Sequence, residues 1–403
     1  MAGKHTQGQA LAHAHTHDHD PAEIEVAQGP RLALLSVLAV AAVATVVGLV
    51  LLWPSGSGVR HAVPHAQYAA AGVTFPEATI TKILPRCGPH QDTAAITCGG
   101  VEARVSNGPT VAVRVPPTNI EAGLRPGDRL ELARTPVSGG PASYVFVGVE
   151  RGTPIWILFA VFVVVVGLVA RRRGLLAIVG LGIGGLLLVK FLLPALLVGR
   201  PGLAVALVGS SAIMFVVLYL AHGPSLRTST ALAGTLGGIT LTALIGVVAV
   251  HAARLSGVSD NNGALLTAFV GDVSFQGLLT CAVIVASLGL LNDVTITQAS
   301  AVWELRAAGP DLSRRTLFGS AMRIGRDHIA SSIYTIVFAY AGTALPILLL
   351  LFIYQRPVLD LLTTEDIATE VVKTLASAIG LVLAVPLTTA VAALTVGGAR
   401  TTD

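Results

Sequence analysis

The sequence has few charged residues, few aromatic residues and little cysteine. Of its 403 residues, 12% are charged and 5% are aromatic, and only three are cysteine. Soluble domains carry about 25% charged residues, so this low charge beside a hydrophobic share of 53% excludes an ordinary soluble enzyme and a disordered chain. Three cysteines exclude a disulfide-dense scaffold. The apolar residues are mostly Ala, Val, Leu, Ile and Gly, which is typical of close-packed membrane helices.

The distribution of basic residues predicts how the chain crosses the membrane. Lys and Arg number 26 against 22 Asp and Glu, and they lie in short segments between apolar runs rather than on one soluble patch. That pattern argues against nucleic-acid binding. It is the positive-inside pattern of membrane proteins. The connections at 171–173, 227 and 306–326 are rich in Arg, so we expect them on the cytoplasmic side of the plasma membrane.

Eight apolar runs are long enough to cross about 30 Å of hydrocarbon. The first, residues 32–53, follows a tail of residues 1–31 that is too long and too acidic for a signal peptide, so it predicts a retained anchor. The other seven lie within residues 151–397, before a short tail at 398–403. Their bounds are 154–170, 175–193, 203–221, 231–250, 278–301, 329–354 and 374–396. We therefore predict a membrane all-α helical bundle of about eight transmembrane helices.

Residues 54–150 have a different composition and predict a small all-β domain between helices 1 and 2. Turn signals such as Asn107-Gly108-Pro109 separate short β-like stretches. These stretches are 78–84, 101–105, 111–115, 129–133 and 144–150. We expect a β-barrel or sandwich on the extracytoplasmic side, with both termini of the chain in the cytoplasm. Its small core would gain stability from a disulfide between Cys87 and Cys98, which persists outside the cytoplasm.

A His-rich segment precedes the anchor. Histidines that alternate with carboxylates can collect Zn²⁺, Ni²⁺ or Cu²⁺. We favour a solvated tail without a structural metal site and keep loose metal collection as the weaker alternative. We expect no cofactor. The candidate metal ligands are His13, His15, His17 and His19.

The apolar run at 278–301 changes character after Leu291, where Asn292 and Asp293 follow. At 1.5 Å per residue, Asp293 lies about 22 Å from Leu278, within the inner half of the membrane. A carboxylate there is unfavourable unless it faces a partner or a water-filled cavity. Asp293 is therefore a functional candidate.

The next helix begins with residues that suit such a carboxylate. A carboxylate, an arginine and a histidine on facing helices are the material of a proton relay. The candidates are Arg323, Arg326, Asp327 and His328. The alternative is an interfacial charge cluster that fixes topology and caps helix ends, and it stays open for Arg326, Asp327 and His328.

Glycines within the apolar runs fall into two spaced patterns. Gly180, Gly182 and Gly185 form G-x-G-x-x-G, but a dinucleotide site needs a strand before this motif. Inside a membrane span we interpret it as helix packing, as we do for Gly234 and Gly238.

Three segments resemble the YibE/F-like family of bacterial membrane proteins. They are LGLLNDVTITQASAVWEL at 288–305, GRDH at 325–328 and AYAGTALP at 339–346. The resemblance extends from about residue 60 to the end and implies a multi-pass membrane protein or permease, without an established substrate. A weaker topological likeness to SecD/SecF and other RND-type proteins rests on the order in which Gly289, Asp293 and a polar-faced helix follow one another in the sequence.

We expect a permease or proton-coupled secondary transporter of unknown substrate. The alternatives are a non-transporting envelope protein whose β-domain binds a partner, and a metal exporter that uses the His-rich tail. The spanning runs lack H-E-x-x-H, G-x-S-x-G and paired aspartyl motifs, which argues against an enzyme. The expected partners are the lipid bilayer and either a small substrate or an envelope component, not nucleic acid. A homo-oligomer stays open.

Overall fold

The structure is a computed structural model that describes residues 26, 28–62, 69–87, 96–137, 139–258, 261–270, 273–354 and 357–397. The four candidate tail histidines lie outside the described residues. The chain divides into two compact units. One combines residues 1–63 with 176–403, and the other is residues 64–175.

The smaller unit contains one five-stranded antiparallel sheet in the order β3-β2-β1-β4-β5. A short helix, α3 (Pro117–Glu121), lies between β3 and β4. The strands are β1 (Glu77–Ile83), β2 (Gly100–Val105), β3 (Thr110–Arg114), β4 (Arg129–Thr135) and β5 (Ser143–Val149). The two edge strands β3 and β5 also contact each other. The prediction of a small β-structure in this segment is confirmed, as a single sheet rather than a sandwich.

The sheet has a small apolar core that follows the period-two alternation of strands. Val101, Ala103 and Val105 of β2 are buried, as are Leu130 and Leu132 of β4. A disulfide joins Cys87 and Cys98, with an S–S distance of 2.05 Å, and connects the segment after β1 to the start of β2. The bond thus links these two segments at the edge of the domain, next to its apolar core.

Helix α4 (Gly152–Val169) belongs to the same unit as the sheet. None of its residues is buried, and nearly all of its side chains are apolar. A helix that is apolar on every side is stable only inside a protein core or a membrane. Its sequence therefore suits a lipid-facing span.

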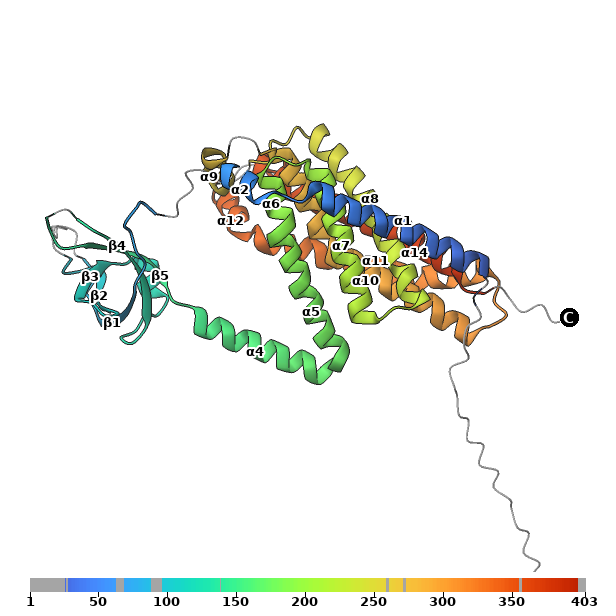
Figure 1. Cartoon of the computed structure of the whole chain (residues 1–403), viewed down its shortest axis with the longest axis horizontal. Helices are drawn as coiled ribbons and strands as arrows, with labels where there is room; N and C mark the ends of the chain where they lie inside the picture. The colour runs from blue at the N-terminus through green and yellow to red at the C-terminus, as the bar shows by residue number, and fades with distance from the viewer. Residues whose placement is uncertain are drawn as a thin grey trace, which may run out of the picture. The chain divides into compact units, whose positions relative to one another are not determined.

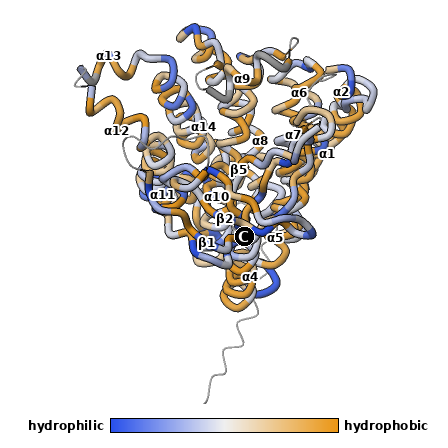
Figure 2. The backbone as a smooth tube through the Cα atoms, turned by 90° about the vertical axis from the view of Figure 1, so that its left-hand side faces the viewer, coloured by the Kyte–Doolittle hydropathy of each residue, from blue (hydrophilic) through white to orange (hydrophobic). Residues whose placement is uncertain are grey.

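The larger unit is a bundle built around α8, α10 and α14, which contact one another along their lengths (Figure 1). Helices α7 and α11 pack on this centre, and α1 packs on α7. The long helices are α1 (Gln28–Leu52), α5 (Arg171–Leu187), α7 (Gly202–His222), α8 (Leu226–Ala252), α10 (Phe275–Ala308), α11 (Arg314–Thr343) and α14 (Glu365–Thr395). The short elements are α2 (Gly56–Ala62), η1 (Leu188–Leu192), α6 (Leu193–Leu197), α9 (Asn261–Phe269), α12 (Leu345–Ile353) and α13 (Val358–Leu362). Hydrophobic residues predominate along most of these helices (Figure 2).

Seven helices among the described residues are long and apolar enough to span a membrane. An eighth span exists only if α11 and α12 together cross once, because the two are bent by 65°. The prediction of one continuous span at 329–354 is therefore wrong, because the helix is broken within it. Helix α11 already begins at Arg314, and the break falls at Ala344, just before Pro346 in the first turn of α12. Proline lacks a backbone donor and its ring crowds the preceding turn, which explains the break.

Close contacts between the central helices depend on glycine. A Cβ at Gly234 would overlap the Thr388 side chain of α14, and one at Gly238 would lie 2.8 Å from Leu291 Cδ2 of α10. The interpretation of these two glycines as packing residues is confirmed. For Gly182 and Gly185 it is wrong, because a Cβ at either position would meet no atom within 4 Å.

Candidate functional site

Asp293 of α10 faces His328 of α11. Asp293 Oδ2 lies 3.6 Å from His328 Nε2, which is an ion pair only when the imidazole is protonated. The Asp293 side chain is 70% exposed and the His328 side chain 30% exposed, so the pair lies at the open edge of the α10–α11 contact. The Nε2 atom itself is buried and has no hydrogen-bond partner among the described residues. One added proton would therefore change this contact from unpaired to ionic.

The pair lies far from either end of α10. This helix is 34 residues long, and Asp293 follows its first residue, Phe275, by about 27 Å along the axis. The neighbouring Asn292 has a buried Oδ1 atom that accepts no hydrogen bond among the described residues. Two adjacent polar residues thus occupy the middle of a span-length helix, where polar groups are retained mainly for function.

Gln298 joins the helices around this pair. Its Nε2 donates to the backbone carbonyl of Ala321 on α11 at 2.9 Å and to Thr389 Oγ1 on α14 at 2.8 Å. Gln298 is only 2% exposed. One turn earlier on α10, Thr295 Oγ1 lies 2.6 Å from Thr235 Oγ1 of α8. These bonds hold α8, α11 and α14 in fixed register against α10, because a buried polar group left unpaired is costly.

The other predicted members of the cluster lie on the exposed side of α11. Arg323 donates to Ser320 Oγ at 2.9 Å, within its own helix. Arg326 and Asp327 are also exposed. Within the described ranges, no ion pair connects Asp293 to either arginine. The structure thus brings His328, rather than Arg323 or Arg326, next to the carboxylate.

The chain matches the family model of the YibE/F-like proteins over residues 158–398. It belongs to the YibE/F-like family. The match begins inside α4 and ends just after α14, so it contains Asp293 and His328 and excludes the sheet domain. No curated protein and no solved structure matches the chain at a significant level.

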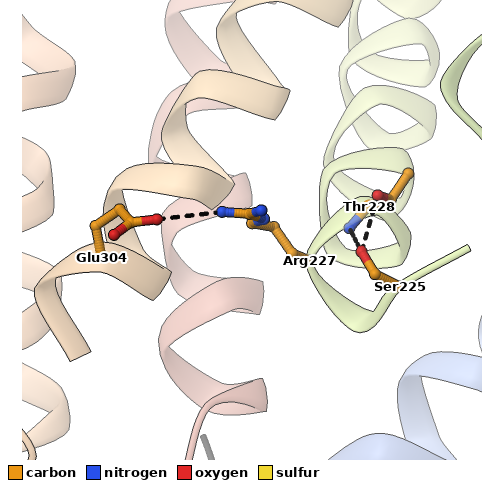
Figure 3. A network of polar contacts seen from close by, with 4 residues as sticks. All are labelled: Ser225, Arg227, Thr228 and Glu304. Carbon is orange, nitrogen blue, oxygen red and sulfur yellow. Dashed lines mark hydrogen bonds and ion pairs between the residues drawn. The ribbon is translucent and has the colours of Figure 1, made fainter. Parts of the chain in front are cut away.

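In this YibE/F-like protein, arginines at the far end of α10 hold the connections in place. Arg227 at the start of α8 lies 3.3 Å from Glu304 Oε1, and Ser225 caps α8 by accepting from the Thr228 backbone N–H at 3.1 Å (Figure 3). Arg306 is 4% exposed and donates to the carbonyls of Pro310 and Leu312 at 2.8 and 2.9 Å. These contacts give the two arginines a structural role.

The described part of the chain contains no group of three or more His, Cys, Asp or Glu residues that could hold a metal ion. Metal collection by His13, His15, His17 and His19 stays a prediction, because those residues lie outside the described ranges. Cys281 is a buried free cysteine in the core of α10.

Proposed function

We propose that this YibE/F-like protein is a proton-coupled secondary transporter of the plasma membrane and that Asp293 carries the proton. The observation that supports the proposal is the 3.6 Å contact between Asp293 and His328 in the middle of a span-length helix. An intramembrane carboxylate that faces a titratable partner is typical of proton pathways in pumps and transporters.

Proton uptake would act on the contact between α10 and α11. With Asp293 ionised and His328 neutral, the pair carries one negative charge, and one added proton converts it into a neutral ion pair. The ion pair attracts α11 towards α10, whereas the singly charged state favours access of water to the carboxylate. A proton can therefore shift the balance between two arrangements of these helices, as coupled transport requires.

The proposed topology has eight spans, counting α11 and α12 as one bent span. Both termini lie in the cytoplasm and the sheet domain lies outside. The Arg-rich connections and the Cys87–Cys98 disulfide support this orientation.

The test measures solute distribution in cells. Mass spectrometry would compare small molecules in cells and medium with and without expression of the protein, and again after a protonophore has collapsed the proton gradient. We expect one class of solute to shift on expression and to return to its basal distribution with the protonophore. A shift that the protonophore leaves unchanged would contradict proton coupling, and no shift at all would contradict transport.

A second candidate function is binding of an envelope component by the sheet domain. A hollow of about 670 Å³ lies between α3, the end of β3 and the middle of β5, with Arg86, Arg114 and Phe146 in its lining. Small five-stranded barrels of the OB type bind oligosaccharides and oligonucleotides. If this domain is the active part, Phe146→Ala in the full chain abolishes function while Asp293→Asn retains it. The transporter proposal predicts that Asp293→Asn abolishes function.

A further inference from the structure

A second polar site lies at the end of the bundle opposite the Arg227–Glu304 pair. An open cavity of about 700 Å³ is lined by the loop after α8, by α9, by the first turns of α10 and α14, and by α12. Helices α9 and α12 lie at the same end of the bundle (Figure 1). One wall is apolar, with Phe275, Leu278 and Ile347, and the other wall is the polar start of α14.

The polar wall contains a half-buried ion pair. Lys373 Nζ lies 2.7 Å from Glu370 Oε1, and the two side chains are 21% and 30% exposed. The neighbouring Glu365 is already engaged, because it accepts from the Ser256 backbone N–H at 2.7 Å and from the Ser256 hydroxyl. Glu370 and Lys373 therefore offer one negative and one positive charge side by side within the cavity, and the exposed Asp366 adds a second carboxylate to its lining.

Thr369 provides an independent sign that the cavity accommodates a ligand. It lines the cavity and is 2% exposed, and its Oγ1 has no hydrogen-bond partner among the described residues. Buried hydroxyl groups in proteins are almost always hydrogen-bonded. A molecule in the cavity would supply the missing partner once the Thr369 side chain turns toward the cavity, because its Oγ1 is buried as the structure stands.

We propose that this cavity is the extracytoplasmic substrate site and that it binds small zwitterions with apolar side chains, of about dipeptide size. A ligand with one charge that pairs with Glu370 or Lys373 separates the two and leaves the other half-buried and unpaired, which is unfavourable. A cation held by the exposed Asp366 alone would gain little, because exposed ion pairs are weak. A zwitterion gives both side chains a new partner at once, because its ammonium group pairs with Glu370 and its carboxylate pairs with Lys373. The apolar wall suits hydrocarbon side chains, and the volume lies in the range of about 300–1,000 Å³ that small-ligand sites occupy.

This inference rests on the proposed transport function and connects to it through α10. Leu278 lines the cavity, and Asp293 lies on the same helix about 22 Å further along. A rigid α10 would thus carry both the substrate wall and the proton-binding group.

The test uses the full-length protein in lipid nanodiscs and three matched probes. Leucyl-leucine has both charges, N-acetyl-leucyl-leucine lacks the ammonium group, and leucyl-leucinamide lacks the carboxylate. Isothermal titration calorimetry would measure the dissociation constant of each. We expect leucyl-leucine to bind and each capped peptide to bind at least tenfold more weakly.

Variants connect the binding to the cavity. Glu370→Gln and Lys373→Gln should each weaken leucyl-leucine binding at least tenfold, whereas Lys190→Gln, at an exposed lysine outside the cavity lining, should leave it unchanged. Thr369→Val keeps the side-chain shape without altering charge, and it should weaken binding severalfold even if the charge variants fold poorly. Its unliganded melting temperature shows whether it has folded.

Three results would overturn the proposal: no binding of leucyl-leucine, equal binding of the capped peptides, or binding that all three cavity variants leave unchanged. The Asp293→Asn protein separates this inference from the transport proposal, because its binding of leucyl-leucine should equal that of wild type. If binding fails but solute distribution still depends on Asp293, only the substrate site is wrong. If binding holds and Asp293→Asn transports normally, only the proton-carrying role is wrong.

Discussion

Individual glycines determine how closely the central helices approach, and Gly234 offers a direct test. Gly234→Ala would place a Cβ against Thr388 of α14, whereas the same change at Gly182 meets no atom within 4 Å. Overpacking costs about 1–3 kcal/mol, so Gly234→Ala should lower the melting temperature. Gly182→Ala should leave it equal or raise it, because alanine gains about 0.5–1 kcal/mol over glycine within a helix. Thermal unfolding of both variants in the same detergent measures the difference.

Equal melting temperatures for the two glycine variants would contradict the close α8–α14 contact. A drop confined to Gly182→Ala would contradict it as well, because that position is open on the structure.

Asp293 was predictable from the sequence because an isolated carboxylate in a long apolar run is conspicuous. His328 was one of several predicted partners, but only the fold selects it over Arg323 and Arg326. The role of Gln298 was not predictable. Its two partners lie 23 and 91 residues away in the chain, and no local pattern links residues so distant.

At the scale of elements, the sheet was the most predictable part. Alternating residues and turn signals placed each strand within about two residues of its observed bounds, because a half-buried strand has a strong period-two pattern. The predicted helix bounds were less accurate where a helix extends beyond its apolar run. Helix α11 begins 15 residues before the predicted span, at Arg314 rather than residue 329, and α14 begins at Glu365 rather than residue 374. Hydropathy detects the membrane-spanning portion of a helix and misses its polar extension.

The disulfide should account for much of the stability of the sheet domain. Cys87 and Cys98 are 11 residues apart in sequence, and closing a loop of that length stabilises the folded state by about 3 kcal/mol in the chain-entropy model. The double substitution Cys87→Ser with Cys98→Ser should therefore speed proteolysis within residues 69–150. Limited proteolysis of the full-length protein in lipid would measure the rate.

Reduced wild-type protein is the matched control for the disulfide variant, and it should be cut at the same increased rate. The helices of the bundle should be cut no faster. Cleavage of the sheet domain at an unchanged rate in both samples would contradict the stabilising role of the bond.

At the scale of the whole molecule, the bent pair α11–α12 determines the number of spans. If the pair crosses the membrane once, there are eight spans and the two termini lie on the same side; if it does not cross, there are seven and the termini lie on opposite sides. We expect a fluorescent protein that folds only in the cytoplasm to be bright when fused at either terminus. The same reporter inserted after Gly108, in the turn before β3, should be dark.

A dark C-terminal fusion beside a bright N-terminal one would contradict the eight-span topology. Alkaline phosphatase fused at the same positions should give the opposite pattern of activity, which controls for fusions that are poorly expressed.

In the proposed mechanism, the whole bundle couples a proton at Asp293 to solute movement. The decisive measurement is the protonophore-sensitive solute shift in cells that express Asp293→Asn, beside Asp327→Asn at matched protein levels. Asp327 is an exposed carboxylate near the end of the same cluster and has no ion pair among the described residues, so its variant is a close control. We expect Asp293→Asn to abolish the shift and Asp327→Asn to retain it. A shift of full size in the Asp293→Asn cells would contradict proton transfer through Asp293.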